Sequence, residues 1–427
     1  MVHPRAIHSP RIVGHWGVTD RVQSTTPKPA ASILMSESQL NIIYHHRTMG
    51  DGAEGIHVSE IVAALRGLGH RVKLVCPKAA KSSPGLQSRP TRLVQASPKL
   101  PKVLKQSLEI AYNMVSYARV CRAVVQTKPD LIYERYSSYN FGGVMAAKHF
   151  RIPLILEVNS TYAGKFGSEF PVVFPAALAM AEKYAFRNAS GIVVVSGALR
   201  ECVESRGVKR DVIQVSPNAI NPEKIASLVN LHSRKDIRRE LRLEDAVVIG
   251  FVGSLREWHG IDLLAQAIPT IAIECPAAKF LIVGSGNLES LLVDVIRKNG
   301  LSDRVILTGA LPHEQVFAHI SAMDIGLMPD SNPWGSPMKV LEYMALGCVP
   351  VVPDLGPLKE IVVDNVTGKL FCCRELSQFV DTIVQLAKDA PLRRRLGDSA
   401  QRDVYENRTW QNNARQITDL FGYVKSV

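Results

Sequence analysis

The chain has 427 residues, of which 46% are hydrophobic and 21% are charged. These proportions are ordinary for a folded globular protein, and they exclude collagen, a disordered tail and a small disulfide-stapled module. The longest apolar runs, such as Gly191–Val195 and Val247–Val252, have the length of buried strands. A multi-span membrane protein is excluded because a membrane helix needs about 20 apolar residues. The length itself predicts two or three domains of roughly 150 residues.

The net charge of +12 is unevenly distributed along the chain. Residues 1–220 hold 28 Lys and Arg against 14 Asp and Glu (+14), and the rest holds 23 against 25 (−2). This asymmetry favours an anionic partner for the first half, although a solvated basic face would give the same count. The seven cysteines form no CxxC pair. We therefore expect reduced thiols in the cytoplasm and no cysteine metal site.

Residues 1–38 differ from the rest of the chain. They are rich in Pro, Ser, Thr and His and lack apolar periodicity and a signal-peptide pattern, so they predict a disordered or loose arm. From residue 39 on, continuous apolar strands alternate with helices such as 56–68. Strands are predicted at 41–45, 71–76, 130–133, 153–158 and 191–195. This alternation predicts a doubly wound domain with a parallel sheet over 39–218.

The same alternation restarts after a break at 216–245. Strands are predicted at 247–252, 280–283, 305–308, 325–328 and 349–352, which gives a second doubly wound domain over 219–407. Residues 408–427 form a separate helix with Trp410, Ala414, Ile417 and Leu420 on one side. Because ligands bind beyond the carboxyl ends of such strands, we expect the loops of the two domains to face a shared cleft.

Residues 98–128 predict a basic helix with one apolar face. That face carries Leu104, Leu108, Ala111, Val115 and Ala118, between several Lys and Arg residues. Two interpretations stay open. The face packs on the domain core, as in an ordinary helix, or it contacts anionic membrane lipid.

Three glycine-bearing loops follow predicted strands, at Gly50–Gly55, Phe251–Gly260 and Val283–Gly286. Glycine lets backbone amides approach a phosphate at a helix N-terminus. The first loop lacks the GxGxxG spacing, and each loop also fits an ordinary turn.

Residues 336–347 are the most informative stretch. Ser336-Pro predicts a helix start, and Lys339 and Glu342 lie three residues apart on neighbouring faces. Helix amides and Lys339 suit a diphosphate, and Glu342 suits ribose hydroxyls, although an intrahelical Lys–Glu pair is the plain alternative.

These motifs together carry a family resemblance from about Leu40 to the end of the chain. They are GIHVSEIVAALRGLGHRV (55–72), PDLIYERYS (129–137), PLILEVN (153–159), GIVVVS (191–196), SPNAIN (216–221), GFVGSLREWHGIDLL (250–264), SPMKVLEYMALGCVPVV (336–352) and TGKLF (367–371). In this order they resemble the family 4 retaining glycosyltransferases, the glycosyl transferases group 1. The resemblance implies an α/β GT-B fold, two Rossmann-like domains facing across a cleft, and a C-terminal helix that crosses back to the first.

The resemblance also implies an activity, the transfer of a hexose from a nucleotide sugar such as a UDP- or GDP-sugar, with retention. The acceptor would be a glycan, a lipid-linked sugar or another small molecule, in polysaccharide or cell-envelope assembly. We expect a cytoplasmic enzyme, with or without peripheral attachment to the membrane, and no nucleic-acid partner, since stacking aromatics are missing. No DxD-type carboxylate pair is present, so no metal and no other cofactor is expected.

Site residues are carried over from the matching motifs. The implied catalytic residues are Lys339, His259 and Asn159. The implied donor-binding residues are Gly52, Gly55, His57, Asn218, Gly253, Ser254, Arg256, Gly284, Pro312, Ser336, Met338, Lys339 and Glu342, the last of them on the ribose.

Several positions depart from the family pattern. Trp334 stands where the fuller motif has a first glutamate, and Ser254 and His259 stand where an Arg and a Lys are common. Arg256, His259 and Lys339 are the candidates to supply the missing charge. Asn159 stands where many members have a histidine.

Two alternatives stay open: a non-catalytic nucleotide-sugar-binding protein, and an epimerase of the same architecture. The epimerase would need acid and base carboxylates, and only Glu134 and Glu157 are seen. Retention could follow a double displacement or front-face attack, and the resemblance favours the latter.

Overall fold

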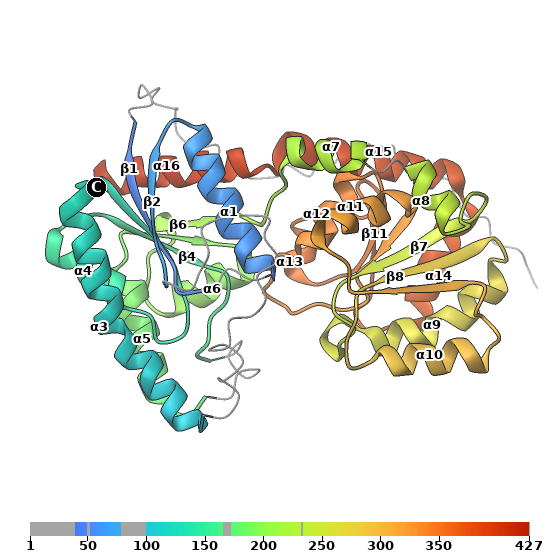
Figure 1. Ribbon diagram of the computed structural model, residues 1–427, viewed down its shortest axis with the longest axis horizontal. Helices are drawn as coiled ribbons and strands as arrows, with labels where there is room; N and C mark the ends of the chain where they lie inside the picture. The colour runs from blue at the N-terminus through green and yellow to red at the C-terminus, as the bar shows by residue number, and fades with distance from the viewer. Residues whose placement is uncertain (1–38, 49–51, 78–99, 165–171, 232–233, 427) are drawn as a thin grey trace, which may run out of the picture. The chain divides into compact units, whose positions relative to one another are not determined.

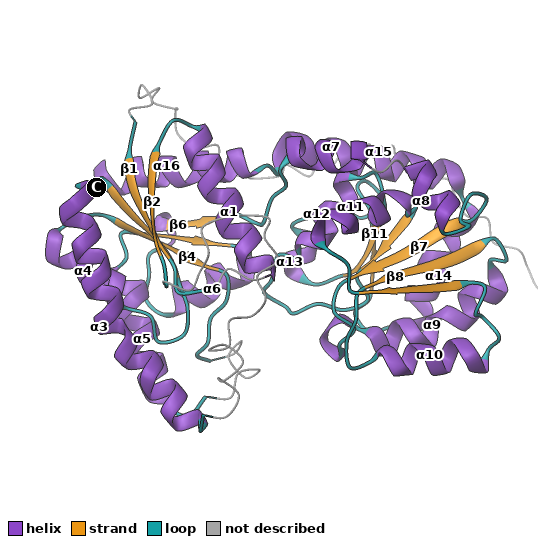
Figure 2. Ribbon diagram, viewed as in Figure 1, coloured by secondary structure: helices purple, strands orange, loops and turns teal. Residues whose placement is uncertain are grey.

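The computed structural model describes residues 39–48, 52–77, 100–164, 172–231 and 234–426. The expected arm at 1–38 and part of the Gly50–Gly55 loop lie outside these residues. The described chain contains two six-stranded parallel sheets with helices packed on them (Figures 1 and 2). The predicted α/β class with two doubly wound sheets is therefore confirmed.

The first sheet has the strand order β2-β1-β3-β4-β5-β6. Its strands are β1 (Asn41–His45), β2 (Arg71–Val75), β3 (Leu131–Arg135), β4 (Leu154–Val158), β5 (Gly191–Val194) and β6 (Ile213–Val215). One face packs against α1 (Gly52–Gly67) and α16 (Trp410–Ser426). The other packs against α3 (Lys102–Thr127), α4 (Gly142–Phe150), α5 (Pro175–Asn188) and α6 (Gly197–Ser205). A short 3-10 helix, η2 (Arg210–Val212), precedes β6.

The second sheet has the order β12-β11-β10-β7-β8-β9. Its strands are β7 (Val247–Val252), β8 (Ala278–Val283), β9 (Val305–Gly309), β10 (Ile325–Leu327), β11 (Val349–Pro353) and β12 (Lys369–Phe371). One face carries α9 (Ile261–Glu274), α10 (Glu289–Lys298) and α14 (Leu376–Lys388). The remaining helices are α7 (Pro222–Leu231), α8 (Arg234–Glu240), η3 (Glu257–His259), α11 (His313–Ala322), α12 (Met338–Ala345), α13 (Gly356–Lys359) and α15 (Ala390–Asn407).

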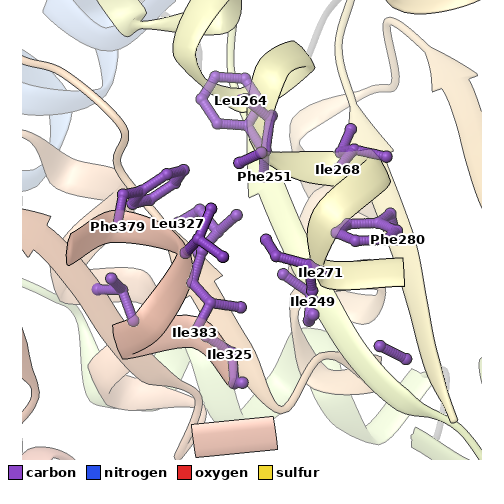
Figure 3. Packing of buried hydrophobic residues seen from close by; sticks show 14 of the residues in the cluster. Ile249, Phe251, Leu264, Ile268, Ile271, Phe280, Ile325, Leu327, Phe379 and Ile383 are labelled. Carbon is purple, nitrogen blue, oxygen red and sulfur yellow. The ribbon is translucent and has the colours of Figure 1, made fainter. Parts of the chain in front are cut away.

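The core of the second sheet holds its strands rigidly beneath the loops. Figure 3 shows Phe251 of β7 and Phe280 of β8 beside Leu264 and Ile268 of α9, with Phe379 of α14 nearby. All five side chains are fully buried, and each contributes roughly 1.5–3 kcal/mol by leaving water. The loops that follow these strands are therefore anchored to a well-packed core.

The C-terminal helix α16 belongs to the core of the first sheet. Trp410, Ala414, Ile417 and Leu420 pack with Tyr44 and with residues of α1, as their spacing predicted. Thr409 forms a parallel bridge with Ile220 just before the helix begins. The expected return of this helix to the first sheet is therefore confirmed.

The predicted strand bounds agree with the structure within two residues, but β6 and β12 were not predicted. Both strands have three residues, and each contains a polar residue, Gln214 or Lys369, so neither forms a continuous apolar run. Helix α1 begins earlier than predicted, so Gly52 and Gly55 lie in its first turn rather than in the loop.

The apolar face of α3 is exposed, so of the two interpretations left open by the sequence, the one that packs this face on the domain core is wrong. Leu104, Leu108 and Val115 are 45%, 53% and 41% exposed, and Ala111 and Ala118 are exposed as well. The buried face of α3 consists instead of Asn113, Ser116, Val120, Ala123 and Val124. Among the described helices, none has the length and apolarity needed to cross a membrane.

Candidate functional site

The loops after β7 and β8 meet the start of α12 at two glycines. Gly253 and Gly284 have φ values of +141° and +135°. A Cβ atom on Gly284 would lie 2.0 Å from the carbonyl oxygen of Gly253, and one on Gly253 would lie 2.6 Å from Nζ of Lys339. Only glycine permits this approach, so the two loops and Lys339 come together as the sequence motifs predicted.

Lys339 carries a buried ammonium group that has no hydrogen-bond partner among the described residues. Its Nζ lies 4.5 Å from the centre of the Phe251 ring. Burial lowers the pKa of Lys339 to about 7, against the opposing effect of Glu342. A buried, unpaired cation is costly, and an anionic ligand at this point would supply the missing partner.

His259 lies beside Lys339 and is buried. Its Nδ1 donates to the carbonyl oxygen of Ser254 at 2.7 Å. Burial, together with the charges of Lys339 and Arg256, lowers its pKa to about 4, against the opposing effect of the Ser254 hydrogen bond. His259 is therefore neutral at pH 7 in the unliganded protein, which leaves Lys339 and the exposed Arg256 as the candidate cations.

Helix α12 places its first turn against residues of both sheets. Pro337 occupies the N-cap and the helix begins at Met338, one residue later than predicted. Met338 packs against the core cluster of α1 and α16. Ser336 and Glu342 are both buried. The N-terminus of α12 is thus a fixed element and not a flexible turn.

A second group of polar side chains surrounds Glu157 at the end of β4. Arg135 pairs with its Oε1, Nε2 of His57 lies 3.1 Å from the same atom, and Nδ2 of Asn159 donates to it at 2.5 Å. The hydroxyl of Tyr44 donates to Oε2 at 3.2 Å. The Glu157 side chain is 2% exposed, so a complete set of partners is required to keep its charge inside the protein.

The partners of Glu157 determine its protonation state. Burial alone would raise the pKa of this carboxyl group, but His57, Arg135 and Asn159 together hold it well below the usual range. Glu157 is thus a carboxylate at every physiological pH, and its oxygens only accept hydrogen bonds.

Asn218 connects this group to α12. Its Oδ1 lies 2.9 Å from Nδ1 of His57, and its Nδ2 donates to the carbonyl oxygen of Ser336 at 2.5 Å. Its backbone N–H donates to Oγ of Ser336 at 2.9 Å. Asn413 of α16 donates to the carbonyl oxygen of Pro217 at 2.8 Å, which fixes the turn from the other side.

Trp334 makes a further connection. It is buried in the cluster of β4, β5 and α6, and its carbonyl oxygen accepts from Oγ of Ser196 at 2.7 Å. The ring therefore serves in packing at the position where the resemblance expected a glutamate.

Glu134, the other carboxylate of the first sheet, lies against the N-terminus of α4. It accepts from Nδ1 of His45 at 2.7 Å and from Asn140 at 2.8 Å. Its Oε2 lies 2.1 Å from where a Cβ atom on Gly143 would be. Glu157 thus stands inside a buried hydrogen-bonded group, whereas Glu134 is bonded through Oε1 and its buried Oε2 has no hydrogen-bond partner among the described residues.

The structure does not join every predicted residue to these two groups. Gly52 is exposed and nothing lies within 4 Å of its Cβ position. Gly55 lies in the same helical turn. Pro312 is exposed at the N-cap of α11. Among the described residues, no side-chain hydrogen bond or ion pair joins these three positions to Lys339 or to Asn218.

Sequence reasoning missed the Arg135–Glu157 pair and the role of Trp334. The signal for the pair was visible, because a charge at the end of an otherwise apolar strand needs a buried partner. The described residues also contain no group of three or more His, Cys, Asp or Glu side chains arranged to hold a metal ion.

Comparisons with known proteins cover most of the chain. Residues 233–403 match the family profile of glycosyl transferases group 1, and residues 52–219 match that of a glycosyl transferase 4-like domain. An uncharacterized glycosyltransferase of Methanocaldococcus jannaschii is 27% identical over 297 residues, which cover 69% of this chain and 75% of that protein. The 2-deoxystreptamine glucosyltransferase of Streptomyces kanamyceticus is 31% identical over 149 residues, 35% of this chain and 38% of that protein.

Solved structures show the same fold. HepE of Anabaena, in complex with UDP, has a TM-score of 0.66 at 18% identity and covers 90% of this chain and 100% of its own. Sucrose-phosphate synthase of Thermosynechococcus elongatus has a TM-score of 0.64 at 19% identity, with 90% and 99% covered. The two parallel sheets and these likenesses together identify the GT-B fold.

Proposed function

We propose, on the premise that this chain is a family 4-type glycosyltransferase of the GT-B fold, that it transfers a hexose from a nucleotide sugar with retention and without a metal ion. The acceptor would be a glycan, a lipid-linked sugar or another small molecule, as part of polysaccharide or cell-envelope assembly. The donor would bind at the start of α12.

One observation carries the proposal, the buried and unpaired ammonium of Lys339 at the start of α12. The leaving group of a nucleotide sugar is a nucleoside diphosphate that gains negative charge as the sugar bond breaks. A cation already in place stabilises that charge without reorganising at the moment of reaction. The helix amides and the open backbone of Gly253 and Gly284 would let the diphosphate approach closely.

Other residues would orient the donor. Glu342, buried three residues after Lys339, would accept hydrogen bonds from the ribose hydroxyls. Arg256 would be free to turn toward the phosphates from the exposed side of its loop. Retention would follow from front-face attack, with the departing diphosphate taking the proton of the acceptor hydroxyl.

The nucleotide is best identified by thermal shift with UDP, GDP and their sugars, each with and without EDTA. A ligand at one hundred times its dissociation constant stabilises the fold by about 2.7 kcal/mol, which is readily seen. HepE of Anabaena has been solved with UDP and with UDP-glucose, which supports UDP as the first choice. A shift that EDTA leaves unchanged is expected. If no nucleotide shifts the midpoint of thermal unfolding, the proposed nucleotide site at the start of α12 is wrong and this position binds a different ligand.

The exposed face of α3 supports an anionic membrane surface as a partner. Leu104, Leu108 and Val115 point away from the core, and Lys102 and Lys105 are exposed beside them. Apolar side chains bordered by lysines suit an interface where acyl chains meet anionic headgroups. The contact would bring the enzyme to a lipid-linked acceptor.

Vesicle co-sedimentation tests this contact. Vesicles with 30% phosphatidylglycerol should retain the wild type, and Leu104→Glu/Leu108→Glu should abolish retention, while pure phosphatidylcholine retains neither. Ile273→Glu is the matched control, because Ile273 is 80% exposed on α9. Equal retention on both vesicle types would exclude an anionic surface.

A further inference from the structure

His57 joins the two polar groups described above, although it was expected to bind the donor directly. It is buried on α1, between Glu157 of the first sheet and Asn218 of the turn that holds Ser336. We propose that His57 is a positioning residue. As an imidazolium it fixes the Asn218 side chain, and through Asn218 it fixes the Ser336 turn at the start of α12. The inference rests on the proposed function, which takes that turn to be part of the donor site.

The hydrogen bonds around His57 require its charged form. Asn218 uses Nδ2 to donate to a backbone carbonyl oxygen, that of Ser336, so the atom facing His57 is Oδ1, which only accepts. The atom on the other side of the ring is a carboxylate oxygen of Glu157, which also only accepts. Both ring nitrogens must therefore donate, and only the imidazolium carries two N–H groups.

The surroundings of His57 suit this charge. Glu157 balances it, with Arg135 of β3 and Tyr44 of β1 reaching the same carboxylate. On the side of α16 the edge of the ring meets the neutral Trp410 at 4.8 Å between centres.

On α1 itself, Glu54 lies one turn before His57 and Glu60 one turn after it. Glu60 pairs with Lys224 at 2.7 Å. The carboxylates near the ring on α1 and β4 thus oppose the Arg135 charge.

The Asn218 link determines where the first turn of α12 lies. Two hydrogen bonds from Asn218 hold Ser336, three residues before Lys339. Without the His57 hydrogen bond, Asn218 is no longer held on that side. The donor amides and Lys339 would then be less well placed, and nucleotide affinity would fall without any lost contact to the nucleotide itself.

Calorimetric titration with UDP and GDP tests the inference. The variants are His57→Gln, Asn218→Ala and the double variant, because the amide of Gln cannot donate toward Glu157 and Asn218 at once. His319→Gln is the control, since that ring bonds a carbonyl oxygen of its own helix at 2.8 Å. Each single variant should weaken nucleotide binding about tenfold or more, and the double variant should be no weaker than either, because the two residues act in series.

The choice of ligand gives a readout that a merely structural role would not change. Asn218→Ala should weaken the binding of inorganic pyrophosphate about as much as that of UDP, because the Ser336 turn places the helix amides and Lys339 that meet the diphosphate. This measurement needs no His57 variant, so it stays decisive if His57→Gln does not fold.

The outcomes separate the two proposals. A wild type that binds neither UDP nor GDP overturns the proposed function, and this inference with it. A wild type that binds, with His57→Gln binding as tightly as His319→Gln, overturns the inference alone. Additive effects in the double variant, or an Asn218→Ala loss that spares inorganic pyrophosphate, overturn it as well.

Discussion

A buried ammonium without a hydrogen-bond partner changes its protonation when an anion arrives. The pKa of Lys339 is lowered to about 7 by burial, so near pH 7 the group is about half charged. A bound diphosphate favours the charged form, which raises this pKa. Binding should therefore take up a proton, and the affinity should fall as pH rises above 7, because the cost of protonating Lys339 grows.

Titration calorimetry in buffers of different ionisation enthalpy measures this uptake. At pH 8 we expect on the order of one proton per nucleotide bound in the wild type, and close to none in Lys339→Ala. Turnover of Lys339→Ala should also fall by about 10²–10³-fold, the scale of losing one preorganised charge. If turnover falls only a few fold, Lys339 acts as an ion-pair partner of Glu342 and not as a charge that stabilises the leaving group.

Glu342 gives a second prediction at the same scale. Glu342→Ala should weaken binding of the nucleoside diphosphate by about tenfold or more, because the ribose hydroxyls lose a charged acceptor. The loss should be much smaller against a ligand that lacks the ribose, such as inorganic pyrophosphate. Equal losses for both ligands in parallel titrations would show that Glu342 acts through Lys339.

At the scale of elements, the start of α4 depends on a glycine. A Cβ atom on Gly143 would meet Oε2 of Glu134 at 2.1 Å. Gly143→Ala must displace a buried carboxylate together with the His45 ring that it holds. We expect a loss of about 1–3 kcal/mol in the free energy of unfolding, the scale of forcing an extra methyl group into a packed core.

Denaturant titration checks this, with Gly422→Ala of α16 as the matched control. Nothing lies within 4 Å of the Cβ position of Gly422, so this change should stabilise the helix by about 0.5–1 kcal/mol. If Gly143→Ala is as stable as the control, the contact with Glu134 is not a constraint.

The strands could be predicted from the sequence where they are continuous apolar runs. β1 and β7 have the predicted bounds, because a strand buried on both faces needs apolar residues at every position. β6 and β12 have three residues each and follow from pairing with a neighbour that only the fold supplies.

The orientation of α3 shows why a periodic pattern alone does not identify the buried face. Its most apolar face is exposed, and the face on the sheet contains Asn113 and Ser116. Asn113 is buried because its side chain caps α4 by accepting from Phe141 and Gly142 at 2.9 Å. The apolarity of α3 itself could not predict which face is buried, because Asn113 is buried through its hydrogen bonds to the start of another helix, α4.

The candidate site could be predicted only in part, because the spacing of residues along the sequence indicates contacts within one helix but not contacts between separate segments. The residues of one motif, Lys339 and Glu342, lie together because a helix fixes their spacing. His57, Asn218 and Ser336 meet only because separate segments converge. Sequence spacing carries no information on such convergence, so their direct hydrogen bonds and the central role of Glu157 became visible only in the structure.

At the scale of the whole molecule, residues 1–38 are rich in Pro, Ser, Thr and His and lack apolar periodicity, a composition that contributes little to a packed core. Removal of residues 1–34 should therefore leave the thermal midpoint and the turnover unchanged. Loss of either in the shortened chain would show that this segment contributes to the fold or to the site.

The packing of α16 also affects the order in which the protein can fold during synthesis. The second sheet is made of one continuous stretch between Ile220 and Thr409, two residues that lie side by side. The α1 face of the first sheet needs Trp410, Ile417 and Leu420, which are translated after the whole of the second sheet. The first sheet, although its strands are translated before those of the second, is thus completed after it. Until then, its apolar α1 face is open to the chaperones and to neighbouring chains.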